Sequence, residues 1–153
     1  MPLPAPLRVR LISALIFTLG GSILGLALWL QPDTRGFGTH QQLGFAPCGM
    51  LLTTGLPCPT CGMTTAFSCT MHGHWLKALW AQPAGFALAL LTAASVVIAG
   101  WSVFTGRPPR WPGRPISPFL LFSSLLALLL FGWAWKLFMG LATHELPVTR
   151  IPL

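Results

Sequence analysis

Three long apolar runs dominate the pattern of hydrophobic and polar positions along the chain. They cover Leu11–Leu30, Ala84–Phe104 and Phe119–Met139, with tryptophans near their ends. Each run has the length of a helix that crosses ~30 Å of hydrocarbon, and tryptophan is typical of the membrane interface. Lys136, near the end of the third run, is interpreted as a cation that reaches out to this interface. The pattern predicts an all-α membrane protein with three transmembrane helices, and we expect residues 1–153 to form a single membrane domain.

A fourth apolar stretch, Leu43–Leu56, is shorter and contains three glycines and a proline. Its length favours a re-entrant or interfacial segment over a full span. A helix is predicted over residues 58–71, with Cys58 at its N-cap and a proline in its first turn. A further helical segment is predicted over residues 74–82, and Pro83 is expected to end it. We therefore expect a re-entrant or interfacial helical segment to carry the cysteines described below.

The first run also contains Gly21 and Gly25, a Gly-x-x-x-Gly spacing that allows a second helix to approach closely. Glycines that are merely tolerated in an apolar helix give the same pattern. The spacing marks a candidate helix-packing face, toward this chain, a membrane protein partner or a second copy.

The composition agrees with a membrane protein, because 54% of the 153 residues are hydrophobic and only 7% are charged. A soluble domain has about 25% charged residues, so most of this surface does not face water. Nine basic residues against two acidic ones would suggest nucleic acid in a soluble protein. Here the basic residues are scattered outside the apolar runs and form no basic helix. We therefore expect the lipid bilayer as a partner, and no nucleic acid.

The arginines also predict an orientation in the membrane. Two precede the first run and three lie between the second and third runs: Arg8, Arg10, Arg107, Arg110 and Arg114. The positive-inside rule places both groups, and the N-terminus, on the cytoplasmic side. We expect a multi-pass protein of the bacterial inner membrane, with the segment 31–83 on the non-cytoplasmic side.

The chemistry of the chain is concentrated in four cysteines between the first and second runs. Cys58 and Cys61 are separated by two residues, while Cys48 lies ten residues before Cys58 and Cys69 eight residues after Cys61. Thiols at the closer spacing meet in one turn, so the pair is a candidate redox disulfide or two ligands of a metal site. Alternatively, Cys48 bridges to one of them and ties two segments together, which stabilises by ~2–3 kcal/mol in an oxidising compartment.

A metal site would draw on more of the thiols and on nearby histidines. Zinc in structural sites takes four such ligands, and neighbouring methionines would also suit copper(I). Cys69 lies ~12 Å from Cys61 along a continuous helix, so it joins the same site only if that helix breaks. The leading expectation is that no cofactor is bound, with zinc or copper as alternatives. The ligands considered for them are Cys48, Cys58, Cys61, His72 and His74.

The cysteine pair lies in the run Thr54-Gly55-Leu56-Pro57-Cys58-Pro59-Thr60-Cys61-Gly62-Met63-Thr64-Thr65-Ala66. With the upstream Cys48, this run resembles a family of small prokaryotic membrane proteins of unknown function, whose pattern is Thr-Gly-x-Pro-Cys-Pro-x-Cys-Gly-x-Thr-Arg-Ala. Thr65 stands where the family has arginine, His74 where it has an acidic residue, and Gln82 where it has asparagine. The resemblance implies a membrane location and a shared motif, and no established activity. The residues singled out as structural in it are Pro57, Pro59, Gly62, Thr64 and Pro83.

Three functions remain open. The leading hypothesis is a non-enzymatic membrane module whose cysteine-rich loop is structural or docks a partner. The alternatives are a membrane thiol–disulfide redox component that uses Cys58 and Cys61, and a membrane protein that binds zinc or copper. Only two carboxylates are present, far apart in the chain, and no nucleophile elbow is found. The sequence thus leans against an enzyme without deciding the question.

Overall fold

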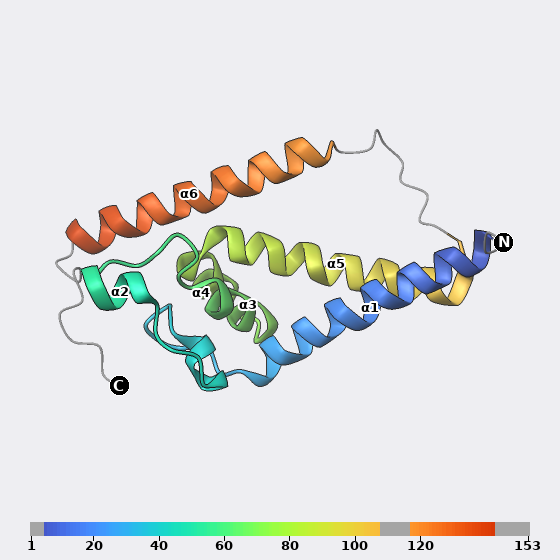
Figure 1. Cartoon of the computed structure of the whole chain (residues 1–153), viewed down its shortest axis with the longest axis horizontal. Helices are drawn as coiled ribbons and strands as arrows, with labels where there is room; N and C mark the ends of the chain where they lie inside the picture. Colours follow the sequence, from blue (N-terminus) through green and yellow to red (C-terminus); the bar gives the residue numbers. More distant parts are fainter. Residues whose placement is uncertain (1–4, 108–116, 143–153) are drawn as a thin grey trace.

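The computed structural model describes residues 5–107 and 117–142, and in these ranges every regular element is a helix. Three long helices run along the molecule (Figure 1): α1 (Ala5–Trp29), α5 (Pro83–Thr105) and α6 (Pro118–Ala142). All three are long and apolar enough to cross a membrane. The predicted all-α fold with three spans is therefore confirmed.

Four short helices connect α1 to α5 and gather at one end of the long helices, on the left of Figure 1. They are the 3₁₀ helix η1 (Thr39–Leu43), α2 (Gly49–Thr54), α3 (Met63–Met71) and α4 (Trp75–Ala81). With only six residues, α2 is too short to span a membrane as a helix, which agrees with the prediction that the apolar stretch around it is not a full span.

The prediction that a helix begins at Cys58 is wrong. The chain first makes two turns, closed by backbone hydrogen bonds from Cys61 N to Cys58 O (3.0 Å) and from Met63 N to Thr60 O (3.1 Å). Gly62 then adopts the left-handed conformation, with φ of 92°, and α3 begins at the next residue. A left-handed residue interrupts a right-handed helix, so the two cysteines of the pair lie in turns.

Pro83 ends the helical segment before it, as predicted, because a proline keeps the preceding residue out of the helical conformation, and Pro83 also begins α5. The last helical residue of α4 is Ala81, and Gln82 is extended, with φ of −166° and ψ of 110°. The fixed φ and missing N–H of proline suit the first position of a helix, where no backbone partner is available in any case. The second span therefore starts one residue before the predicted apolar run.

Helices α1 and α5 pack against each other along much of their length (Figure 1). At Gly20 a Cβ atom would lie 2.6 Å from Cγ2 of Val96, so glycine permits the close approach. At Gly21 and Gly25, in contrast, nothing in the described chain lies within 4 Å of such an atom. The close contact within the chain is thus one residue earlier than the predicted packing face, and a role of that face toward a second chain stays a prediction.

Helix α6 is exposed over most of its length and meets the other elements near Gly132. A Cβ atom there would lie 2.8 Å from Cδ of Pro83 and 2.9 Å from Oε1 of Gln82. The third long helix is therefore anchored at the junction between α4 and α5, next to the cysteine-bearing turns.

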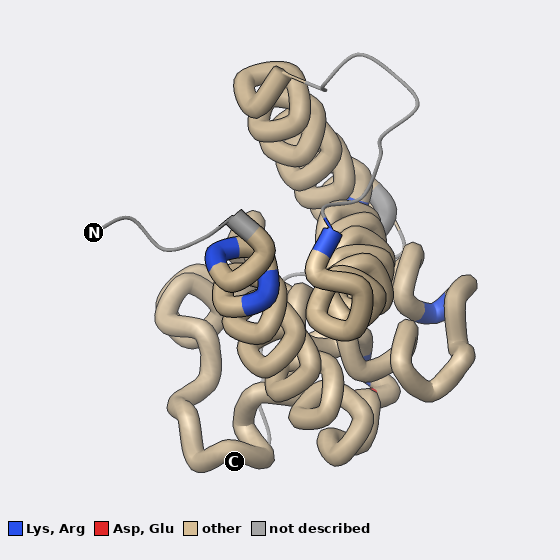
Figure 2. The backbone as a smooth tube through the Cα atoms, turned by 90° about the vertical axis from the view of Figure 1, so that its right-hand side faces the viewer, with Lys and Arg blue, Asp and Glu red and all other residues tan. Residues whose placement is uncertain are grey.

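The described arginines of the two predicted cytoplasmic groups lie at the opposite end of the molecule, which Figure 2 views end-on. Arg8 and Arg10 are in the first turns of α1, and Arg107 follows α5. A Cβ atom at Gly106 would lie 3.0 Å from Nε of Arg10, so the two groups adjoin. The other arginines of the connecting loop, Arg110 and Arg114, lie outside the described residues.

Replacing Gly20 with leucine is expected to destabilise the protein by about 1–3 kcal/mol, because the new side chain overlaps Val96 in a packed helix pair. The matched control Gly21→Leu adds the same side chain where nothing lies within 4 Å, and little change is expected. Thermal unfolding of the purified protein in detergent measures both. Equal losses for the two variants would contradict the assignment of Gly20 to the contact between α1 and α5.

Candidate functional site

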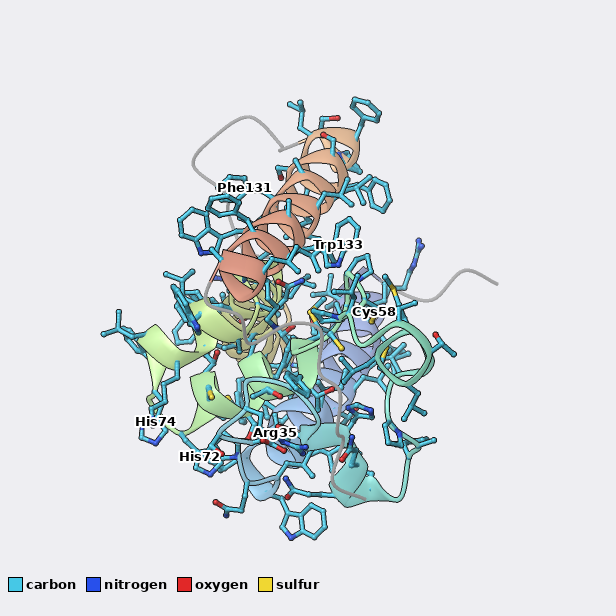
Figure 3. The ribbon with its side chains drawn as sticks, turned by 90° about the vertical axis from the view of Figure 1, so that its left-hand side faces the viewer. Arg35, Cys58, His72, His74, Phe131 and Trp133 are labelled. Atoms are coloured by element: carbon cyan, nitrogen blue, oxygen red, sulfur yellow. The ribbon has the colours of Figure 1, made fainter. Side chains whose placement is uncertain are left out.

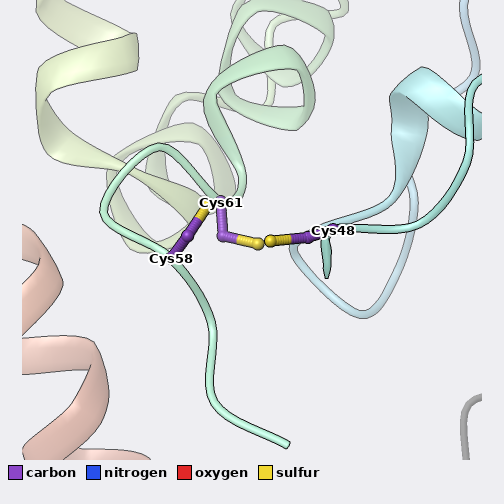
Figure 4. Close-up of side chains that lie close together, drawn as sticks. All are labelled: Cys48, Cys58 and Cys61. Carbon is purple, nitrogen blue, oxygen red and sulfur yellow. The ribbon is translucent and has the colours of Figure 1, made fainter. Parts of the chain in front are cut away.

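Three of the four cysteines converge between the start of α2 and the turns before α3. The Sγ atoms of Cys48, Cys58 and Cys61 all lie within 4.8 Å of one another, and Figure 4 shows the three side chains meeting. Among the described residues, no other group of three or more His, Cys, Asp or Glu side chains is close enough to share a metal ion. The structure thus brings together three of the five ligands considered from the sequence.

Local backbone geometry explains this convergence. The turn closed by the Cys61 N to Cys58 O hydrogen bond (3.0 Å) brings the two thiols of the pair together. Cys48 reaches them from the other side, as the residue that caps the N-terminus of α2. The Cys58 thiol also lies 3.3 Å from the hydroxyl of Thr60. The three thiols therefore come from two separate segments, which the site joins.

Two side chains of α6 hold the cysteine-bearing turns in place. The indole Nε1 of Trp133 donates to the carbonyl oxygen of Pro57 at 2.8 Å, and Figure 3 shows this side chain near Cys58. Lys136 Nζ donates to the carbonyl oxygens of Ala81 at 2.6 Å and Cys61 at 3.2 Å. The interpretation of Lys136 as an interfacial cation is therefore wrong: its ammonium group turns inward and finds backbone oxygen atoms.

A third side chain and a glycine complete this support. Gln82, which is 1% exposed, donates through Nε2 to the carbonyl oxygen of Pro59 at 2.6 Å. A Cβ atom at Gly62 would lie 2.6 Å from the carbonyl oxygen of Ala81 and 2.9 Å from Lys136 Nζ. Because that space is filled, only glycine fits there. The hydrogen bonds to Pro57 and Pro59 use backbone carbonyl groups, which any residue would supply, so a structural role of these two side chains stays a prediction.

The other candidate ligands lie elsewhere. Cys69 is buried on α3, which continues unbroken from Met63 to Met71 and so keeps it away from Cys61. The His72 ring Nδ1 lies 2.9 Å from the carbonyl oxygen of Ser68, and His74 is exposed before α4. Figure 3 shows both histidines well apart from Cys58. The structure does not bring them to the thiols.

The three thiols line a cavity of about 360 Å³. A residue that the sequence did not single out, His40 of η1, lines the same cavity, and Thr64 is part of its wall. The histidine is separated from each cysteine by several residues, so no spacing pattern marks it. The other lining residues are Gly38, Thr60, Gly62, Met63 and Thr65.

The thiols differ in how readily they ionise. Burial raises the pKa of Cys61 to about 12, and burial also raises the pKa of Cys69. Burial acts in the same direction on Cys48, but hydrogen bonds from the Leu51 backbone and the Cys58 thiol outweigh it and lower the pKa. Cys48 is therefore more readily ionised than Cys61.

Comparison with known proteins adds one finding. A family described as "Protein of unknown function (DUF2752)" matches residues 48–96. The match begins at Cys48, contains all four cysteines and extends into α5. No curated protein matches the chain, and no solved structure does so. The similarity covers less than half of the chain and carries no known activity, so the chemistry rests on the site itself.

Replacing Lys136 with methionine is expected to loosen the cysteine-bearing turns, because the Ala81 and Cys61 carbonyl groups lose their partner. Leaving buried acceptors unpaired costs about 1–3 kcal/mol each. We expect a lower thermal stability and a severalfold faster alkylation of Cys61 by N-ethylmaleimide, followed by mass spectrometry.

The matched control is Lys77→Met, which removes an exposed ammonium group from α4. It should leave the alkylation rate of Cys61 unchanged. If the two variants behave alike, Lys136 does not hold the turns.

Proposed function

We propose that this chain is a non-enzymatic membrane module whose cysteine loop binds one soft metal ion, Zn²⁺ or Cu⁺, through Cys48, Cys58 and Cys61. The observation that carries the proposal is that these three Sγ atoms lie within 4.8 Å of one another. Thiolates at ~2.3 Å from a zinc ion in a tetrahedral site are about 3.8 Å apart. Only a small contraction of the group would therefore be needed to bind the ion.

The chemistry of the ligands supports a soft metal. Thiolates select Zn²⁺ and Cu⁺ over hard cations such as Mg²⁺ and Ca²⁺, which take oxygen ligands. The only acidic residue among those described, Asp33, forms an ion pair with Arg35 at 2.7 Å and does not line the cavity. The site has no carboxylate, so catalysis by a pair of carboxyl groups is not available to it. This favours binding over catalysis.

The hydrogen bonds that hold the cysteine-bearing turns also favour metal binding. Trp133, Gln82 and Lys136 fix backbone carbonyl groups on both sides of the thiol pair. A loop held in this way has little entropy left to lose when a ligand binds, which raises affinity without new contacts. The site is thus organised before the ion arrives.

Thiol–disulfide exchange is the second candidate, because the lowered pKa of Cys48 provides a nucleophile beside the pair. The Cys48 thiolate would attack Cys58 of a Cys58–Cys61 disulfide, forming a Cys48–Cys58 bond and releasing Cys61 with the electron pair. However, the pKa of Cys61 is about 12, and a thiol of high pKa is a poor leaving group. The same pKa also raises the cost of a metal-bound thiolate, but a metal ion would be held by all three thiols at once, so metal binding is the better proposal.

The same proposal includes a location in a bacterial inner membrane, with the N-terminus cytoplasmic and the cysteine loop non-cytoplasmic. Support comes from Arg8, Arg10 and Arg107, which lie at the end of the long helices remote from the short ones (Figures 1 and 2). Basic residues at the end of spanning helices favour the cytoplasmic side. The relation to a prokaryotic membrane family rests on the motif residues quoted above.

The protein, purified in detergent under reducing conditions and desalted after loading with Zn²⁺ or Cu⁺, is expected to retain about one equivalent of metal in a site with three thiolate ligands. Elemental analysis measures this. Changing Cys48, Cys58 or Cys61 singly to alanine should weaken retention at least tenfold, because each removes one ligand.

The control is Cys69→Ala, which removes a buried thiol outside the group and should retain the metal. Retention that is unaffected by all three substitutions, or absent from the wild type, refutes the proposed function.

The orientation is tested with a chain whose only cysteine is Cys58, which is partly exposed. A membrane-impermeant maleimide added to spheroplasts should label it without lysis. A second chain with Arg107→Cys as its only cysteine should be labelled only after the membrane is opened, since it lies at the other end of the spans. The reverse result would place the cysteine loop in the cytoplasm.

A further inference from the structure

His40 is held beside the thiols by the residue before it. The Thr39 hydroxyl lies 2.8 Å from the Thr65 hydroxyl of α3, and the two side chains are 0% and 1% exposed. Thr39 Oγ1 also accepts a hydrogen bond from Asp33 N at 3.1 Å. These contacts hold η1 against α3, and His40 of η1 lines the same cavity as Cys48, Cys58 and Cys61.

Neither ring nitrogen of His40 lies within 4.8 Å of all three Sγ atoms, so the side chain must shift toward the thiols to share an ion with them. The hydrogen bonding of the His40 ring leaves one nitrogen available for this. Its Nε2 lies 3.3 Å from the carbonyl oxygen of Ala46, and within the described chain the ring has no other hydrogen-bond partner. A carbonyl only accepts, so in the neutral ring this contact places the proton on Nε2 and leaves the lone pair on Nδ1. Metal-binding histidines almost always donate their other ring N–H to a carbonyl or carboxylate oxygen in this way.

We infer that His40 is the fourth ligand of the thiol site and that the site is a Cys₃His zinc centre. The inference rests on the proposed function, and it extends that proposal by naming the missing ligand and the metal. Three cysteines and one histidine form one of the ligand sets of structural zinc sites. The ion would then join η1, the start of α2 and the turns before α3.

The charges favour Zn²⁺ over Cu⁺. Three thiolates and a neutral imidazole around Zn²⁺ give a net charge of −1, whereas three thiolates around Cu⁺ give −2. Lys136, whose Nζ donates to the carbonyl oxygen of Cys61 at 3.2 Å, supplies one positive charge next to the ligands. A charge left unbalanced at a partly buried site is costly, so the zinc centre fits the surroundings better.

The test uses the full-length protein in detergent, loaded with Co²⁺ as a visible probe of zinc sites and then titrated with Zn²⁺ against a chromophoric chelator. His40→Ala should weaken Zn²⁺ binding about tenfold or more and change the Co²⁺ absorption bands, because a nitrogen ligand is lost. The control His74→Ala removes an exposed imidazole far from the site and should alter neither.

Added imidazole separates a ligand role from a merely structural one. In His40→Gly, free imidazole should restore both the Co²⁺ bands and most of the Zn²⁺ affinity, which a loss of packing would not permit. An unchanged affinity and spectrum in His40→Ala, with binding still abolished by Cys61→Ala, overturns the role of His40 and leaves the proposed function standing. A wild type that binds Cu⁺ but not Zn²⁺ also overturns this inference alone. No binding of either metal overturns the proposed function itself.

Discussion

The ammonium group of Lys136 links the third long helix to the cysteine site. A charged side chain near the end of an apolar span is costly unless it finds partners, and Lys136 finds the carbonyl oxygens of Ala81 and Cys61. Those carbonyl groups belong to the end of α4 and to the turns before α3. The two hydrogen bonds offset the cost of burying the ammonium group and stabilise both backbone segments. They also anchor α6 to the rest of the chain at this point.

Side chains near Lys136 donate hydrogen bonds to the irregular backbone between α2 and α3. The turns between α2 and α3 have few backbone partners of their own, and carbonyl groups left unpaired away from water are costly. Trp133 and Gln82 provide donors to the carbonyl groups of Pro57 and Pro59. The helices α2, α3 and α4 are too short to be stable in isolation, so they depend on such contacts. The cysteine site is therefore supported by side chains that are remote from it in sequence.

Part of the site could be predicted from the sequence. The spacing of Cys58 and Cys61 allows both thiols to meet in any single turn, whether helical or not, and the turn that the chain makes there brings them together. Cys48 is also among the ligands considered from the sequence, but only the tertiary path of the chain brings it to the pair. His40 was missed because its position depends on the buried Thr39–Thr65 contact, which joins residues 26 apart in the chain. Nothing local marks such a pairing.

The three spans were determined by the sequence alone, because the length and hydropathy of a run depend only on consecutive residues. The start of α3, the use of Gly20 instead of Gly21 at the contact with α5, and the inward turn of Lys136 were decided by the tertiary structure. Each depends on what another segment places nearby: the Ala81 carbonyl beside Gly62, Val96 beside Gly20, and two acceptors within reach of an ammonium group. Sequence determines how far an apolar segment extends, whereas only packing decides which of its residues meet another part of the chain.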